Sequence, residues 1–170
     1  YQHNRRNGWG FIIPDFETTS FGAYAFDRYT IKKDLILNAG VRYDHVTTNI
    51  HSYNDWFKTP ISATDSVYKQ RSQDLHRSFN SLTWSAGINY ATGNWILKAN
   101  IGKSFRVPIP KELGTDGINY HIFRYEKGNP TLNPEESYQL DLGLRWGNDK
   151  VTVQFDPYLN YFPNYIYMNP

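Results

Sequence analysis

Cysteine is absent from this 170-residue chain, which excludes disulfides, thiol catalysis and zinc–thiolate sites. Long apolar runs are absent as well, because no stretch approaches the roughly 18 apolar residues that a transmembrane helix needs. An excess of charge of one sign is absent: the chain has 18 Lys and Arg and 16 Asp and Glu. No basic stripe points to a nucleic-acid partner. The chain begins at Tyr1 without a signal-like segment and stops in apolar sequence. We therefore expect a segment of a longer protein.

What the chain has is a regular rhythm of long strand-like segments and two classes of connection. The joints near residues 32–34, 92–93 and 147–149 are tight, whereas those at 46–79 and 107–135 are about ten times longer. In an up-and-down sheet alternate joints lie at the same end, so short turns and long loops separate to opposite ends. That asymmetry is typical of outer-membrane β-barrels. The predicted strands are 19–29, 33–45, 80–91, 94–106, 136–147 and 150–162.

Alternation gives each predicted strand an apolar and a polar face. In 138–146, Leu140, Leu142 and Leu144 alternate with Asp141, Gly143 and Arg145. These strands have about 11 residues, and a tilted strand of about 9–11 residues spans a bilayer, whereas soluble strands average about 5–6. Aromatic residues, 17% of the chain, lie near the ends of the apolar rows, as an interfacial girdle requires. The residues predicted to face a wet lumen are Arg42, Asp44, Lys98, Asn100, Asp141 and Arg145. Segment 19–29 is apolar on both faces and cannot be phased.

Three motifs carry a family resemblance. They are Gly-Val-Arg-Tyr-Asp at 40–44, Lys-Ser-Phe-Arg-Val-Pro at 103–108 followed by Glu112-Leu113, and Gly-Asn-Pro-Thr-Leu-Asn-Pro-Glu at 128–135. In this order and spacing they resemble the TonB-dependent outer-membrane receptors. The resemblance implies that residues 1–170 form a partial β-barrel domain, a segment of an all-β, antiparallel, up-and-down barrel of 22 transmembrane strands. The plug domain of the family is absent from this chain.

The resemblance also implies a function for the parent protein, in the outer membrane of a Gram-negative cell. Such receptors bind a scarce nutrient outside, here an iron chelate (siderophore) or haem, and import it with energy passed through TonB. TonB would engage the missing N-terminal region, and membrane lipid and lipopolysaccharide would surround the barrel. No cofactor is implied. Lys58, Lys69, Arg71 and Arg77 of loop 46–79 would face solvent or lipopolysaccharide phosphates.

Haem-uptake members carry a motif pair resembling 105–108 and 129–132, with a His between the two motifs. Here that residue is His121, and a neutral imidazole is a good axial ligand of haem iron. His121 is thus a possible metal ligand, although Val107 and Thr131 depart from the usual motifs and an ordinary loop histidine is the other reading. The candidate ligand-binding residues are Arg106, Tyr120, His121 and Arg124 in the second loop and Tyr53 and Trp56 in the first.

Two other architectures fit the alternation: a soluble β-sandwich that binds a ligand such as carbohydrate through exposed aromatics, and a small closed barrel of about eight strands. An enzyme is not expected. Asp44 and His45 would point to opposite faces of a strand. The sequence contains no nucleophile elbow, phosphate-binding glycine loop or HExxH motif.

Overall fold

The computed structural model describes residues 1–5, 11, 13–119 and 121–169. The chain divides into two compact units. Unit 1 comprises Tyr1–Phe21, His45–Phe79 and Val107–Asn133, and unit 2 comprises Gly22–Asp44, Asn80–Arg106 and Pro134–Pro170. No described helix is both long and apolar enough to cross a membrane.

One antiparallel sheet contains the predicted strands, in the order β1-β2-β3-β6-β7-β10-β11, with β12 also on β10. Strands β11 and β12 both pair with β10 and keep the same register: Leu144 pairs with Phe155, and Asp141 pairs with Tyr158. Pro157 separates them, since it has no N–H to donate, although its carbonyl still accepts a 2.9 Å hydrogen bond from Leu142. The six predicted strands are therefore confirmed, and β1 is an additional short one. The strands are β1 (Gln2–Asn4), β2 (Phe16–Lys32), β3 (Leu35–Ile50), β6 (Leu75–Thr92), β7 (Trp95–Arg106), β10 (Glu135–Gly147), β11 (Thr152–Phe155) and β12 (Tyr158–Asn164).

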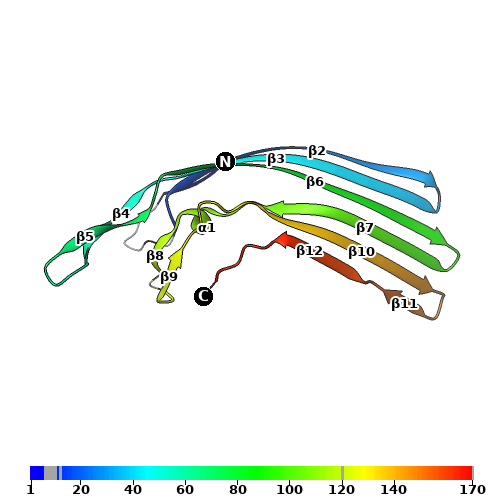
Figure 1. The fold of residues 1–170 in the computed structure, drawn as a ribbon. Coiled ribbons are helices and arrows are strands. Elements are labelled where there is room, and N and C mark those ends of the chain that lie inside the picture. The colour runs from blue at the N-terminus through cyan, green and yellow to red at the C-terminus, as the bar shows by residue number, and fades with distance from the viewer. Residues whose placement is uncertain (6–10, 12, 120, 170) are drawn as a thin grey trace. The chain divides into compact units, whose positions relative to one another are not determined.

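Within unit 2 the three tight turns lie together at one end of the strands (Figure 1). Gly93 has a φ of 52°, a left-handed conformation that a side chain disfavours, and it allows β6 to turn directly into β7. Between β10 and β11, the Asn148 side chain accepts 2.9 Å hydrogen bonds from the N–H groups of Lys150 and Val151. This Asx turn reverses the chain. The grouping of short turns at one end is thus confirmed.

The register across β6, β7 and β10 sorts side chains into rows, as the alternation predicted. Ile88 pairs with Ala99, which pairs with Leu142, so these three residues share one face. The adjacent positions Asn89, Lys98 and Gly143 form a row on the opposite face. Strands β6, β7 and β10 therefore each have an apolar and a polar face.

Strand β2, which the sequence left unphased, is oriented by its glycine. A Cβ on Gly22 would lie 2.5 Å from both Arg42 Nη2 and Asp44 Oδ1, and a Cβ on Gly40 would lie 3.1 Å from the Phe26 ring. Gly22 and Phe26 are therefore on the face that carries Arg42 and Asp44. Both faces of β2 bear aromatic residues, so the sequence does not show which face is the polar one. The contacts at Gly22 and Gly40 assign it.

The described residues of unit 1 form two hairpins and one short helix besides the strand ends of the main sheet. The hairpins are β4–β5 (Tyr53–Pro60 and Ser66–Ser72) and β8–β9 (Asp116–Asn119 and Arg124–Lys127), and the helix is α1 (Pro110–Gly114). Much of the connection predicted at 46–79 is strand, because β3 continues to Ile50 and β6 begins at Leu75.

A small apolar core holds unit 1 together. It consists of Phe16, Ile50, Phe79 and Leu113, with Leu75, Val107 and Leu132 packed against it. Leu113, Val107 and Leu132 come from the Pro-containing motifs. Strand β7 ends at Arg106, the predicted position, because Pro108 cannot donate a ladder hydrogen bond, and turns after Gly128 lead into β10 at Glu135. These motifs therefore have a structural role in closing the core.

Candidate functional site

On the polar face of unit 2, Arg42 and Asp44 form a two-pronged ion pair along β3. Arg42 Nη2 lies 2.6 Å from Asp44 Oδ1, and Arg42 Nε donates to Asp44 Oδ2 at 2.7 Å. Asp44 is buried whereas the guanidinium remains half exposed. Gly22 leaves the space in which this pair lies.

The other residues predicted to face the lumen lie in the same polar rows. Asn100 pairs with Asp141, and Lys98 pairs with Gly143, while Arg145 pairs with Gln154 of β11. The Gln139 amide donates to both carboxylate oxygens of Asp141, at 3.0 and 2.9 Å. The structure thus brings Lys98, Asn100, Asp141 and Arg145 to one face, and Arg42 and Asp44 share a face of β3. That these faces line a water-filled lumen remains a prediction.

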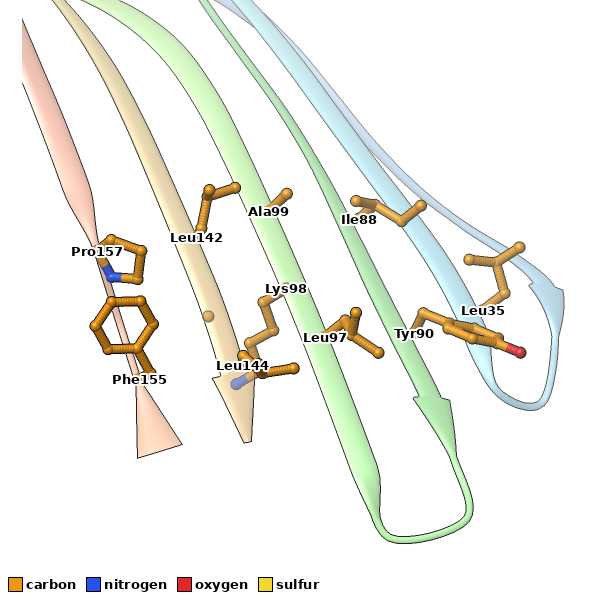
Figure 2. Close-up of a pocket in the computed structure, with 11 residues that line it drawn as sticks. Leu35, Ile88, Tyr90, Leu97, Lys98, Ala99, Leu142, Leu144, Phe155 and Pro157 are labelled. Carbon is orange, nitrogen blue, oxygen red and sulfur yellow. The ribbon is translucent and has the colours of Figure 1, made fainter. Parts of the chain in front are cut away.

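The opposite face of unit 2 is a broad apolar surface with a shallow groove of about 720 Å³. Figure 2 shows the groove side chains on neighbouring strands, among them Ile88, Leu97 and Leu142. Leu142 is 44% exposed, so the surface is not a closed core. Trp95 and Trp146 lie at the turn end of these rows, with ring centroids 6.4 Å apart.

An ion pair interrupts the apolar rows further along the same strands. Lys103 Nζ lies 2.6 Å from Glu136 Oε1 and 5.7 Å from the centre of the Tyr138 ring. Trp84 pairs with Lys103, and Tyr138 pairs with Tyr161. The apolar band in these strands is therefore bounded by aromatic residues at both ends, an arrangement typical of membrane interfaces.

In unit 1, the Gly-Asn-Pro motif is held against α1 by backbone hydrogen bonds. The N–H of Gly128 donates to Thr115 O at 2.6 Å, and that of Asn129 donates to Glu112 O at 2.7 Å. A Cβ on Gly128 would lie 2.8 Å from Glu112 O. The following turn is fixed by the Asn129 side chain, which accepts hydrogen bonds from the Thr131 N–H and hydroxyl at 2.9 and 2.7 Å.

All four basic residues of loop 46–79 have partners in the structure that the sequence did not reveal. Arg71 is only 4% exposed and its Nη2 lies 2.6 Å from Asp55 Oδ2, so the expectation that it faces solvent or phosphate is wrong. Arg77 donates to Pro130 O and, at 2.9 Å, to Leu132 O. Of the lysines, Lys58 lies over the Tyr68 ring and Lys69 over the Tyr125 ring, at 5.6 and 5.1 Å from their centres.

A cluster of charged side chains lies at Glu126 of hairpin β8–β9. The buried Glu126 carboxylate lies 2.6 Å from Lys111 Nζ and 3.3 Å from Arg124 Nη2. Burial alone would raise the pKa of Glu126, but the hydrogen bonds from Lys111 and Arg124 outweigh it and lower that pKa. The neighbouring Tyr125 hydroxyl donates to Asp116, and this hydrogen bond and burial raise the pKa of Tyr125.

Two of the candidate ligand-binding residues share hairpin β8–β9. His121 is exposed in the hairpin loop, and Arg124 begins β9 with its side chain half exposed. Tyr120 lies outside the described residues. Across the described part of the chain, no group of three or more His, Cys, Asp or Glu side chains could hold a metal ion.

The other candidates lie elsewhere. In β4, Trp56 is exposed, whereas Tyr53 is half-buried with its ring stacked on Phe11 at 5.5 Å. Arg106 ends β7, where its Nη2 lies 3.3 Å from Glu135 Oε2. A role in ligand binding for these residues remains a prediction.

Unit 1 also contains a polar pocket of about 360 Å³ that sequence reasoning missed. Its wall includes Gln73, Asp74, Thr115 and Lys127, with Leu113 as an apolar part. The backbone N–H of Ser52 donates to Asp74 at 2.9 Å and lowers the pKa of that carboxyl. These residues come from separate elements, so their spacing in the sequence gave no signal.

Residues 2–170 match the family described as TonB dependent receptor-like, beta-barrel. No curated protein matches.

Among the solved structures that share the fold are two with the following similarity to this chain. One is a double mutant of the Serratia marcescens hemophore receptor HasR in complex with its hemophore HasA and heme, with a TM-score of 0.72, 22% identity and 94% of this chain covered. The other is the copper transporter OprC, with a TM-score of 0.63, 17% identity and 88% covered. The chain spans only 27% and 22% of their lengths. Because the family match extends over residues 2–170 and the strands have the expected two faces, the chain belongs to the TonB-dependent receptor β-barrel family.

Proposed function

We propose that this chain is part of an outer-membrane receptor of a Gram-negative bacterium that binds a scarce nutrient and imports it with energy from TonB. The observation that carries the proposal is the strand arrangement of unit 2. Neighbouring strands share an exposed apolar face and an opposite polar face, and the three tight turns lie at one end of the strands. TonB would engage a region of the receptor outside this chain. Lipid and lipopolysaccharide would surround the apolar band, and no catalytic step is assigned to the receptor.

We further propose that the nutrient is an iron chelate, either a siderophore complex or haem. His121 is exposed on a hairpin between two motifs that resemble those of haem-uptake receptors, and imidazole is a good axial ligand for haem iron. HasR, which shares the fold, was solved with its hemophore and heme. OprC is a copper transporter, so copper is the competing nutrient to be tested.

The test is uptake by the intact receptor in its own cells. A strain lacking the receptor gene would be grown with hemin or a ferric siderophore as its sole iron source, and its copper content would be measured in parallel. We expect growth on one iron source to fail without the receptor or without TonB, with copper content unchanged. A fall in copper content with normal growth on both iron sources would contradict the proposal.

The variant His121→Ala then distinguishes the two candidate nutrients, haem and a ferric siderophore. If haem is the nutrient, we expect hemin binding to fall at least about tenfold, the effect of losing about 1.4 kcal/mol of binding free energy. His76→Ala is the matched control, because His76 is also exposed but its ring is hydrogen-bonded to Asn49 at 2.6 Å. Unchanged hemin binding by His121→Ala would remove the haem reading and leave the siderophore.

A further inference from the structure

The polar pocket of unit 1 lies between two walls, and the first wall is the base of hairpin β8–β9. Asp116 pairs with Lys127 across the two strands, so their side chains lie on the same face of the hairpin. Asp116 accepts a hydrogen bond from the Tyr125 hydroxyl, and Lys127 is exposed. Because both residues line the pocket, this wall carries a carboxylate and an ammonium group.

The second wall is the segment that joins β5 to β6. Gln70 and Asp74 line the pocket from this segment. Two hydrogen bonds fix its backbone: the Ser72 hydroxyl donates to His51 O at 2.7 Å, and the Ser52 N–H donates to Asp74 Oδ1 at 2.9 Å. A carboxylate can accept several hydrogen bonds, so Asp74 retains acceptor capacity for a ligand.

Apolar side chains and a buried hydroxyl complete the pocket. Leu113, which is 1% exposed, lines it together with Leu75 and Pro130. Thr115 also lines the pocket and is 4% exposed, and its hydroxyl oxygen has no hydrogen-bond partner among the described residues. Buried polar groups are almost always hydrogen-bonded. Thr115 therefore favours a ligand that brings a hydrogen-bonding group into the pocket.

The charges and the size of the pocket exclude several classes of ligand. An anion would be repelled by the carboxylates of Asp74 and Asp116, and a metal cation by the ammonium of Lys127. The described residues also contain no group of three or more His, Cys, Asp or Glu side chains that could hold a metal ion. The volume of about 360 Å³ is near the lower end of the range for ligand sites, about 300–1,000 Å³. The best ligand is therefore small, polar and uncharged.

We propose that the polar pocket of unit 1 binds a neutral saccharide ring, at a site of which His121 is not a part. A sugar hydroxyl both donates and accepts hydrogen bonds, so neighbouring hydroxyls can bind a carboxylate and the Lys127 ammonium together. The C–H groups of the ring would pack on Leu113 and Pro130. Free sugars and lipopolysaccharide both contain such rings. The inference goes beyond the proposed function, because it does not depend on which iron chelate is imported.

The experiment titrates the full-length receptor, purified in detergent and freed of lipopolysaccharide, by isothermal titration calorimetry. The probes are glucose, galactose, N-acetylglucosamine and the lipid-free, dephosphorylated core oligosaccharide released from lipopolysaccharide of the same cells. We expect at least one probe to bind with a Kd below about 1 mM. Binding of a free sugar would identify a soluble saccharide as the ligand, and binding of the core oligosaccharide alone would identify lipopolysaccharide.

Near-isosteric variants test which groups hold the sugar. Asp74→Asn and Asp116→Asn keep an oxygen for the existing hydrogen bond but lose the charge. Each should weaken sugar binding about tenfold, because hydrogen bonds to charged groups are the stronger ones. Asp65→Asn is the matched control, since Asp65 is also exposed and accepts a hydrogen bond from the Ser66 N–H at 2.8 Å, but does not line the pocket. It should bind sugar as the wild-type receptor does.

A steric variant tests the location of the site. Gln73 lines the pocket and is exposed, so the fold should tolerate a larger side chain there. We expect Gln73→Trp to fill part of the pocket and lose sugar binding, while growth on the iron source stays normal. Normal growth would also show that this variant is folded and inserted.

Two results would overturn the proposal. One is a wild-type receptor that binds none of the four probes. The other is a sugar that binds equally well to Gln73→Trp and to both pocket aspartate variants, because it would then be held elsewhere. Iron uptake is measured separately, so a failure of the proposed function would leave the result at the pocket unchanged.

Discussion

At the residue scale, two glycines are required for different physical reasons. Gly128 packs against the backbone of α1, where an added Cβ would lie 2.8 Å from Glu112 O and 2.9 Å from Gly114 N. Gly93 has open space around it but a φ of 52°. The first glycine permits a close approach, and the second permits a left-handed turn.

These reasons predict local and separable effects. Gly128→Ala must push two backbone segments apart and should destabilise the docking of the Pro-containing motifs by about 1–3 kcal/mol, the usual cost of overpacking. Hydrogen exchange of the full-length receptor should then quicken at residues 110–132. Gly93→Ala, the matched control, should cost about 1–2 kcal/mol and quicken exchange only around the β6–β7 turn. Unchanged exchange at 110–132 in Gly128→Ala would show that α1 moves aside without cost.

At the element scale, the docking of hairpin β8–β9 depends on the ionised form of Glu126. Its pKa is lowered in the folded state, below that of an unperturbed glutamate. A lowered folded pKa contributes stability that is present above the unfolded pKa and is lost as the pH falls through the folded pKa. Acidification below about pH 4.3 should therefore loosen the hairpin.

Hydrogen exchange at residues 116–127, compared between pH 6 and pH 3.5 after correction for the intrinsic rate, measures this effect. Glu126→Gln keeps the shape of the side chain but cannot titrate, so its corrected exchange should be higher at pH 6 and vary little with pH. A wild-type hairpin that is equally protected at both pH values would mean that Lys111 and Arg124 do not stabilise it through Glu126.

The same elements show what sequence reasoning could reach. The long strands were predicted because burial of one face imposes a period of two, as in 138–146. Hairpins β4–β5 and β8–β9 were missed because the ion pairs that fix them, Asp55 with Arg71 and Lys111 with Glu126, leave no periodic signal in the sequence. Strand β2 could not be phased because aromatic residues occupy both faces, and only the contact of Gly22 with the Arg42–Asp44 pair decides.

The candidate site also has features that the sequence predicts and features that only the structure shows. The spacing of His121 and Arg124 suggested one loop, and they do share one hairpin. No pattern in the sequence shows that Phe123, in the loop of hairpin β8–β9, has a φ of 49°. Likewise, the pairing of Arg124 with Glu126 needs the strand geometry.

At the scale of the whole molecule, the exposed apolar face of unit 2 must be covered by lipid or by protein to be stable. Several large side chains on this face are more than one-third exposed, among them Leu97, Ile101, Leu140, Leu142 and Leu144. Monomeric soluble proteins rarely leave so continuous an apolar surface in water. A bilayer would cover this face, whereas a second layer of protein would make it the core of a sandwich, and the two environments can be distinguished by direct measurement.

Single cysteines at Leu140, Asp141, Leu142 and Gly143 of the full-length receptor would carry spin labels, in a background without other cysteines. Alternate residues point to opposite faces, so lipid-soluble relaxation agents should reach Leu140 and Leu142 in outer membranes and should not reach Asp141 and Gly143. The polar row pairs Asp141 with Asn100 and Gly143 with Lys98, so a water-soluble agent should show the reverse preference if this face lines a wet lumen. Exclusion of both agents from Leu140 and Leu142 would mean that protein covers the apolar face, and the transmembrane assignment of these strands would then fail.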